Sequence, residues 1–117
     1  MSGSSPRPAA QPVALLHGLA GEYDGVELEL GTGRVTLGRD PRVSQLVFSE
    51  EAASVSDRHC AVWFDSAARA VMVEDLWSAQ GTFLATGRRL AGGEPQRLEP
   101  SDRFYLGQPD VLFEVRY

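Results

Sequence analysis

Short hydrophobic runs separated by turn-forming residues recur along this chain from Val13 to its last residue. The clearest run, 26–30, alternates valine or leucine with glutamate at every step, as expected for a strand with one buried face. Glycine, proline, serine and aspartate lie between the runs and favour turns. After a first strand near His17, we therefore predict strands at 26–30, 34–38, 46–48, 59–64, 70–73, 82–84, 89–90, 97–98, 104–106 and 111–117.

Three of these runs carry information about pairing. Residues 65–69 read as a turn between 59–64 and 70–73, which predicts a hairpin. The final run places hydrophobic side chains at alternate positions, so we expect it to be paired inside a sheet. The one helix-prone patch, 50–53, is too short to be stable by itself. Many short strands with few helical signals predict an all-β sandwich or barrel.

The first 12 residues differ from the rest of the chain. They hold three of its seven prolines and few large hydrophobic residues, so they bury too little surface to fold. The remaining length is that of one domain, and it is sufficient to form a core without disulfides or a metal. We expect a disordered tail over 1–12 and a single folded domain over 13–117.

Composition narrows the classes of partner. The 117 residues are 43% hydrophobic and 23% charged, as in a soluble globular protein, and no apolar run is long enough to cross a membrane. The net charge of −5 argues against nucleic acid, which needs a basic surface, and weakly against any polyanionic ligand. All 11 basic residues are arginine, and Asn and Ile are also absent, which suggests a G+C-rich bacterial genome. The lone Cys60 cannot form an internal disulfide, which fits the cytoplasm.

Catalytic, metal and cofactor chemistry find little support. His59 and Cys60 are neighbours in a predicted strand, so their side chains point to opposite faces and cannot form a nucleophile–base pair. His17 has no evident partner, and two histidines with one cysteine lack the spacing of a zinc site. A nucleotide-binding loop of the P-loop type is excluded because the chain has no lysine. We expect no enzyme activity, no metal and no cofactor.

Four segments occur in an order that resembles a forkhead-associated (FHA) domain. They are Gly38-Arg39, Ser56-Asp57-Arg58-His59, the third loop from Asp75 to Phe83, and Leu98 to Gly107. Each segment alone is unspecific, but their order and spacing on a chain predicted to be all-β are specific together. The resemblance covers nearly the whole of 13–117. It implies a β-sandwich of about eleven strands that binds phosphothreonine peptides through loops at one end.

The resemblance implies that Arg39 and Ser56 hold the phosphate. Their chemistry is suitable, because a guanidinium grips two phosphate oxygens at once and a serine hydroxyl donates a further hydrogen bond. Gly38 would let the chain turn sharply as it leaves its strand.

Three more residues match the family's structural positions. His59 would support the loops without touching the ligand, and Gly81 and Thr82 would shape the third loop. Trp63 is expected to pack in the fold, whereas Trp77 lies in the third loop and either packs or faces a peptide.

Five positions lie near the implied phosphate, and three of them depart from the family pattern. Gln80 stands where the family usually has Asn, and Ala79 lacks the hydroxyl that often reaches the phosphate. Asp57 would repel a phosphate unless it is paired, and Arg42 and Arg58 are its candidate partners.

Two functions are therefore expected. The first is a phosphothreonine-peptide-binding module that docks a Thr-phosphorylated protein in Ser/Thr-kinase signalling. The alternative, motivated by the three departures, is a degenerate FHA domain that acts as a phosphate-independent interaction or scaffold module.

Overall fold

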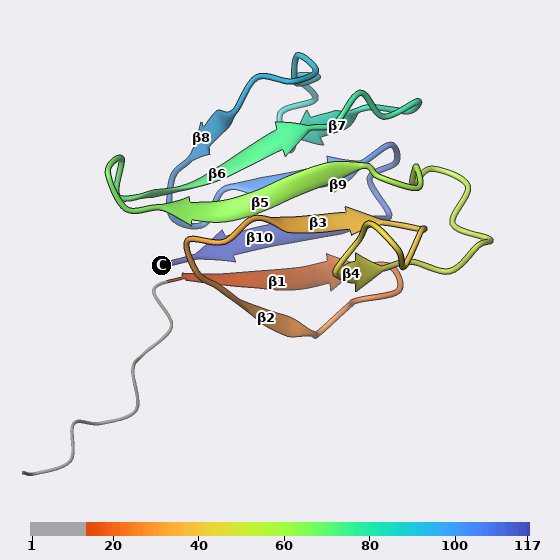
Figure 1. Ribbon diagram of the computed structural model, residues 1–117, viewed down its shortest axis with the longest axis horizontal. Coiled ribbons are helices and arrows are strands. Elements are labelled where there is room, and N and C mark those ends of the chain that lie inside the picture. Colours follow the sequence, from red (N-terminus) through yellow and green to blue (C-terminus); the bar gives the residue numbers. More distant parts are fainter. Residues whose placement is uncertain (1–13) are drawn as a thin grey trace, which may run out of the picture.

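The computed structural model describes residues 14–117, which form two β-sheets packed face to face (Figure 1). The tail expected over 1–12 lies outside the described residues. In chain order the strands are β1 (Ala14–Ala20), β2 (Glu27–Leu30), β3 (Val35–Gly38), β4 (Leu46–Val47), β5 (Cys60–Asp65), β6 (Ala70–Asp75), β7 (Thr82–Leu84), β8 (Gln96–Leu98), β9 (Arg103–Leu106) and β10 (Leu112–Arg116). The expectation of an all-β sandwich is confirmed.

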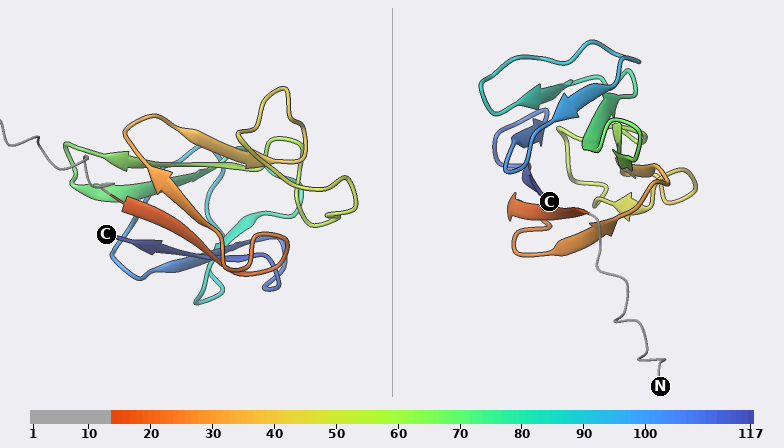
Figure 2. Two further views of the ribbon diagram at one scale, coloured as in Figure 1. Left: turned by 90° about the horizontal axis from the view of Figure 1, so that it is seen from below. Right: turned by 90° about the vertical axis from the view of Figure 1, so that its left-hand side faces the viewer.

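Each sheet has five strands. One has the order β2-β1-β10-β9-β7 and the other β4-β3-β5-β6-β8. All neighbours are antiparallel except β3 and β4, which run parallel. The C-terminal strand β10 lies between β1 and β9, as its hydrophobic pattern predicts, and β5 and β6 form the predicted hairpin. The two layers separate clearly when the molecule is viewed from below (Figure 2).

The core lies between the inner faces of the two sheets. Phe104 and Phe113 stack there with ring centroids 5.7 Å apart, and Phe48 meets Phe113 edge-on at 6.2 Å. Burying one such side chain contributes about 1.5–3 kcal/mol. The other large, fully buried hydrophobic residues come from both sheets and their loops: Leu16, Leu30, Leu37, Val55, Val62, Val71, Val73, Leu98 and Leu106.

The segment 89–90 is the sequence expectation that differs from the structure. Residues 89–90 do not form a strand, because the chain reverses at Gly87 and only Arg89 forms an isolated bridge, with Phe83. The described residues therefore contain ten strands instead of about eleven. Residues 50–53 form hydrogen-bonded turns, and 14–117 contain no helix, hence none that is long and apolar enough to span a membrane.

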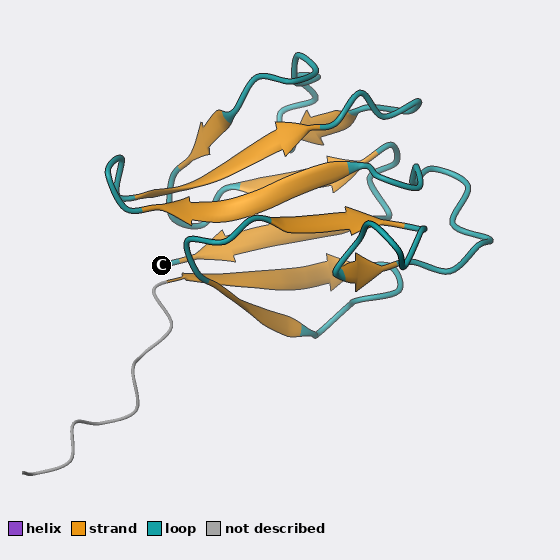
Figure 3. Ribbon diagram, viewed as in Figure 1, coloured by secondary structure: helices purple, strands orange, loops and turns teal. Residues whose placement is uncertain are grey.

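The strand directions bring several loops to one end of the sandwich. The connections β1–β2, β3–β4, β4–β5, β6–β7 and β9–β10 all lie there, whereas the β5–β6 turn and the C-terminus lie at the opposite end (Figure 1). The β4–β5 connection is the long loop that projects beyond the strands (Figure 3). Its base is tied to the β1–β2 loop, because the Glu22 carboxylate accepts a hydrogen bond from the Ser49 N–H at 3.0 Å.

Candidate functional site

Backbone hydrogen bonds join the loop after β3 to the loop before β5. The Arg39 N–H donates to the Ser56 carbonyl and the Asp40 N–H to the Asp57 carbonyl, both at 3.1 Å. Ser44, which is buried, donates its hydroxyl to the same Asp57 carbonyl at 2.9 Å. The two segments that carry the candidate phosphate ligands are thus held side by side.

Gly38 is required by this close approach. A Cβ at this position would lie 2.1 Å from the Asp57 carbonyl oxygen and 2.6 Å from the Ser44 Oγ. The φ of Gly38 does not lie in the left-handed region, so the expected reason for this glycine, freedom to turn, is wrong. The physical reason is that a side chain would push the β4–β5 loop away from β3.

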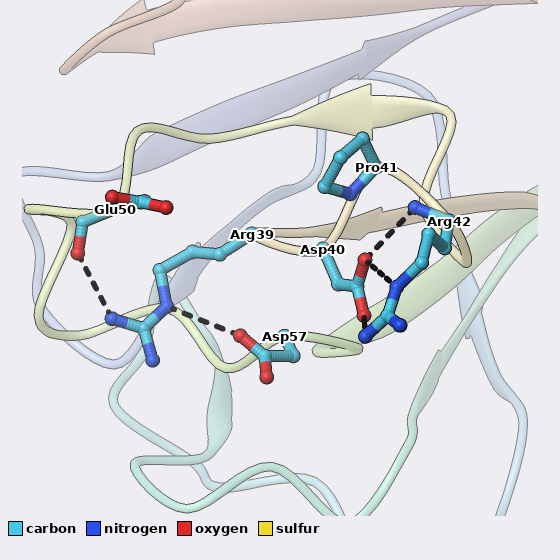
Figure 4. A pocket seen from close by; sticks show the side chains of 6 residues that line it. All are labelled: Arg39, Asp40, Pro41, Arg42, Glu50 and Asp57. Atoms are coloured by element: carbon cyan, nitrogen blue, oxygen red, sulfur yellow. Dashed lines mark hydrogen bonds and ion pairs between the residues drawn. The ribbon is translucent and has the colours of Figure 1, made fainter.

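Arg39 points its guanidinium across the loop end (Figure 4). One terminal nitrogen donates to the Glu50 carbonyl at 3.1 Å. Its Nε lies 3.7 Å from the Asp57 carboxylate, an ion pair that is too long for a hydrogen bond. Nε is buried and finds no hydrogen-bond partner within 14–117. A guanidinium has five N–H donors, and besides the bond to Glu50 and the buried Nε its remaining terminal N–H groups are unused and can bond to an anion.

Ser56 faces the third loop, the β6–β7 connection. Its Oγ accepts a hydrogen bond from the Ala79 N–H at 3.0 Å. Because the oxygen accepts in that bond, the hydroxyl proton remains free to donate to a ligand. Ala79 has no hydroxyl to offer a phosphate, and what it contributes is this backbone contact with Ser56.

His59 connects the two loops from below. It is fully buried, its Nδ1 accepts from the Ser56 N–H at 3.0 Å, and its Nε2 donates to the Gly81 carbonyl at 2.9 Å. These two bonds require the neutral ring with its proton on Nε2. Burial lowers the pKa of His59, and the Gly81 carbonyl and the nearby Asp75 only partly oppose that shift. The ring does not line the exposed hollow at the loop end.

Asp75 organises the third loop, a role that the sequence analysis did not assign. Its buried carboxylate accepts from the Ser78 hydroxyl at 2.5 Å and from the Thr82 hydroxyl at 2.8 Å. The Ser78 Oγ in turn accepts from the Gly81 N–H at 2.9 Å. The spacing of Asp75, Ser78 and Thr82 in one short loop was the available signal, since such residues often bond locally.

The backbone conformation at position 81 requires glycine. Its φ is +90°, which side chains other than glycine rarely adopt, and the Arg89 Nε lies 2.7 Å from where a Cβ would be. Its carbonyl also accepts from the Gly107 N–H at 2.9 Å, besides the bond from His59. Gly81 is therefore the point where the β4–β5, β6–β7 and β9–β10 loops meet.

The remaining side chains of the third loop are exposed. Gln80 projects at the loop end, and its amide makes no hydrogen bond within the described part of the chain. Trp77 is 79% exposed and adopts φ 60°, with its indole lying against the backbone of Gly92 and Gly93. Trp77 therefore packs on one face and presents the other to solvent.

A hollow of about 390 Å³ opens beside Arg39 (Figure 4). Arg42 lines it but is turned onto Asp40, with Nε–Oδ1 and nitrogen–Oδ2 distances of 3.1 and 2.9 Å. These bonds hold the pKa of Asp40 below its usual value and raise that of Arg42. The full lining is Arg39, Asp40, Pro41, Arg42, Glu50 and Asp57.

Asp57 is paired, but not with either expected arginine. Its carboxylate lies beside Arg39, while Arg42 bonds to Asp40. Arg58 is exposed, forms no ion pair within 14–117 and does not line the hollow. The reason is geometric. The backbone of 39–40 is hydrogen-bonded to the backbone of 56–57, and this places the side chain of Arg39 beside that of Asp57.

Metal and thiol chemistry find no support in the described residues. Within 14–117, no three side chains of His, Cys, Asp or Glu come together as a metal site. Cys60 is fully buried, and burial raises the pKa of its thiol, which keeps it protonated and unreactive.

Comparisons with known proteins agree on one family. A sequence model of the FHA domain matches residues 35–107. The FHA domain of the CT664 protein from Chlamydia trachomatis superimposes with a TM-score of 0.73 at 28% identity, covering 89% of this chain and 96% of that one. No match was found among curated proteins.

Two further solved structures share the fold. The N-terminal FHA domain of Rad53p from S. cerevisiae, solved with a phosphothreonine peptide, has a TM-score of 0.70 at 17% identity and covers 89% of this chain and 92% of that one. The cytoplasmic domain of PscD, a T3SS sorting platform protein from P. aeruginosa, has a TM-score of 0.63 at 24% identity and covers 87% and 78%. At these identities the likeness concerns the fold alone.

Replacing Gly38 by alanine tests the close approach of the loops. We expect Gly38→Ala to lower the free energy of unfolding by about 1–3 kcal/mol, because the Cβ overpacks against backbone. Gly33→Ala is the matched control, since a Cβ there meets no atom within 4 Å. Urea unfolding of both variants measures the difference, and equal stabilities would contradict this account of Gly38.

The pKa of His59 can be measured directly by NMR titration in a His17→Gln background, which leaves one histidine. We expect a midpoint below the ordinary value of about 6.5. Between that value and the lower native pKa, the unfolded chain binds a proton at His59 and the folded chain does not, so stability falls as pH falls through this window. A midpoint above about 6.5 would refute the buried, neutral ring.

Proposed function

The chain belongs to the FHA domain family, and from that premise we propose that it binds phosphothreonine peptides through Arg39 and Ser56. FHA domains are interaction modules, and the Rad53p domain that shares this fold was solved with a phosphothreonine peptide. The ligand of this chain is then a Thr-phosphorylated protein, the product of a Ser/Thr kinase. The arginine-only basic composition supports a bacterial source, and the buried, unpaired Cys60 is compatible with the cytoplasm.

One observation carries this proposal: Arg39 and Ser56, which both keep unused donors, are joined through their backbones, although Ser56 does not line the hollow beside Arg39. The Arg39 N–H bonds to the Ser56 carbonyl, which couples the positions of the two residues. A phosphate has close to two negative charges and three strong acceptor oxygens. The guanidinium supplies charge and paired donors, and the Ser56 hydroxyl supplies a further donor because its oxygen is already used by Ala79.

Gln80 takes the place of the family's Asn in this proposal. Its amide is exposed at the same loop end as Arg39 and Ser56, and it can bond to the peptide backbone. The extra methylene makes this contact looser, because more side-chain freedom is lost on binding.

A phosphate-independent scaffold is the second candidate, and Asp57 is the observation that favours it. Its carboxylate already occupies the neighbourhood of Arg39, where a phosphate would bind. The shared fold of the PscD domain, from a T3SS sorting platform protein, is compatible with an assembly role. Partner binding that survives both Arg39→Ala and phosphatase treatment would identify this function.

Removing Arg39 tests the phosphate site. We expect Arg39→Ala to weaken binding of a phosphothreonine peptide about ten- to hundredfold, the loss typical of hydrogen bonds to a charged group. Isothermal titration calorimetry measures the affinity, and NMR shifts at Ser56 and Gln80 report the site. Arg69→Ala, an exposed arginine in the β5–β6 turn at the opposite end, is the matched control. The proposal fails if the unphosphorylated peptide binds equally well.

Ser56 offers a second, independent test. We expect Ser56→Ala to weaken phosphopeptide binding about tenfold, because the hydroxyl donor is lost and the Ala79 N–H loses its acceptor. Ser56→Thr keeps a hydroxyl and should retain more affinity than Ser56→Ala. Ser66→Ala in the distant turn controls for loss of an exposed serine hydroxyl. Unchanged affinity in Ser56→Ala would remove this residue from the site.

A further inference from the structure

The hollow beside Arg39 has more carboxylates than arginines. Two arginines and three acidic residues line it, so its formal charge is negative before any ligand enters. Arg42 is engaged by Asp40 through two side-chain hydrogen bonds, and its electrostatic interaction with Asp57 is weaker than that with Asp40. Asp57 and Glu50 therefore share a single remaining cation, Arg39, which contacts the carboxylate of the first and the carbonyl of the second.

A bound phosphate changes the balance around Asp57. Once the Arg39 guanidinium bonds to phosphate oxygens, its 3.7 Å ion pair with Asp57 is weakened or lost. The Asp57 carboxylate then lies beside a phosphate that carries about two negative charges, and the two anionic groups repel each other. Asp57 is 71% exposed, so its carboxylate is open to contact from the ligand side.

Within 14–117, no cation lines this hollow besides Arg39 and Arg42. Arg42 is held by Asp40, Arg58 does not line the hollow, and the sequence contains no lysine. A cation carried by the ligand would supply the compensating charge beside Asp57.

We propose that this site selects phosphothreonine peptides that carry an arginine or lysine close to the phosphothreonine, and that Asp57 is the specificity-determining residue that receives this cation. The inference rests on the proposed function, since it assumes that phosphate binds at Arg39. Glu50, on the other side of the same hollow, adds negative potential that favours the same ligands (Figure 4). In ligands without such a residue, Asp57 lowers affinity by competing for Arg39.

The test uses an alanine-based peptide with a central phosphothreonine and one arginine moved through the flanking positions. The control peptides carry citrulline, the uncharged analogue of arginine, at the same positions. We expect the wild-type domain to bind the arginine peptide about two- to fivefold more tightly than its citrulline counterpart at one or more positions, as for an exposed ion pair. Fluorescence anisotropy at low ionic strength measures both affinities.

Asp57→Asn completes a double-mutant cycle with these peptides. We expect the ratio between arginine and citrulline peptides to fall to about one, and the citrulline peptide to bind about two- to fivefold more tightly than it binds wild type. Glu29→Gln removes one negative charge from an exposed position of β2 and should leave the ratio unchanged. A preference for arginine that persists in Asp57→Asn overturns the inference.

The two failures are distinguishable. If phosphothreonine peptides bind but show no preference for arginine at any position, the inference fails while the proposed function stands. If neither wild type nor Asp57→Asn binds any of the phosphothreonine peptides, the proposed function fails and the inference falls with it.

Discussion

The loop end of this domain depends on one neutral imidazole. His59 joins the Ser56 backbone to the Gly81 carbonyl, and so ties the β4–β5 loop to the β6–β7 loop from inside the protein. The Gly81 carbonyl also accepts a hydrogen bond from the Gly107 N–H, which attaches the β9–β10 loop to the same point. Because a charged ring would present two donors and lose its bond from the Ser56 N–H, burial and hydrogen bonding favour the same protonation state.

The net charge of the molecule does not decide whether an anion binds at this end. A net charge of −5 would argue against an anionic ligand, yet a phosphate site depends on where a few arginines point. Arg42 is engaged by Asp40 through two side-chain hydrogen bonds, whereas the Arg39 side chain donates one, to the Glu50 carbonyl, and keeps terminal donors for a ligand. Asp57 competes with a bound phosphate for Arg39. The ion pair between Asp57 and Arg39 therefore affects both the affinity for a ligand and the preference between ligands.

Much of the fold could be read from local patterns. The alternation at 26–30, the turn between β5 and β6 and the apolar face of the last strand all predicted elements that the structure contains. Such signals are local, because a strand's buried face and a turn's backbone are encoded within a few residues. The prediction of a strand at 89–90 was wrong. Two strand-forming residues do not determine whether a neighbouring strand runs alongside them for long enough to form a ladder.

The sequence by itself determined the family, the strand pattern and the positions of Arg39, Ser56 and His59 in two loops, the one after β3 and the one before β5. Only the tertiary structure decided which charges meet. Arg39 faces Asp57 and Arg42 faces Asp40 because the loop after β3 lies against the loop before β5, an approach that the absence of a side chain at Gly38 permits. Contacts between segments distant in sequence follow from packing, and no periodicity or local propensity in either segment specifies them.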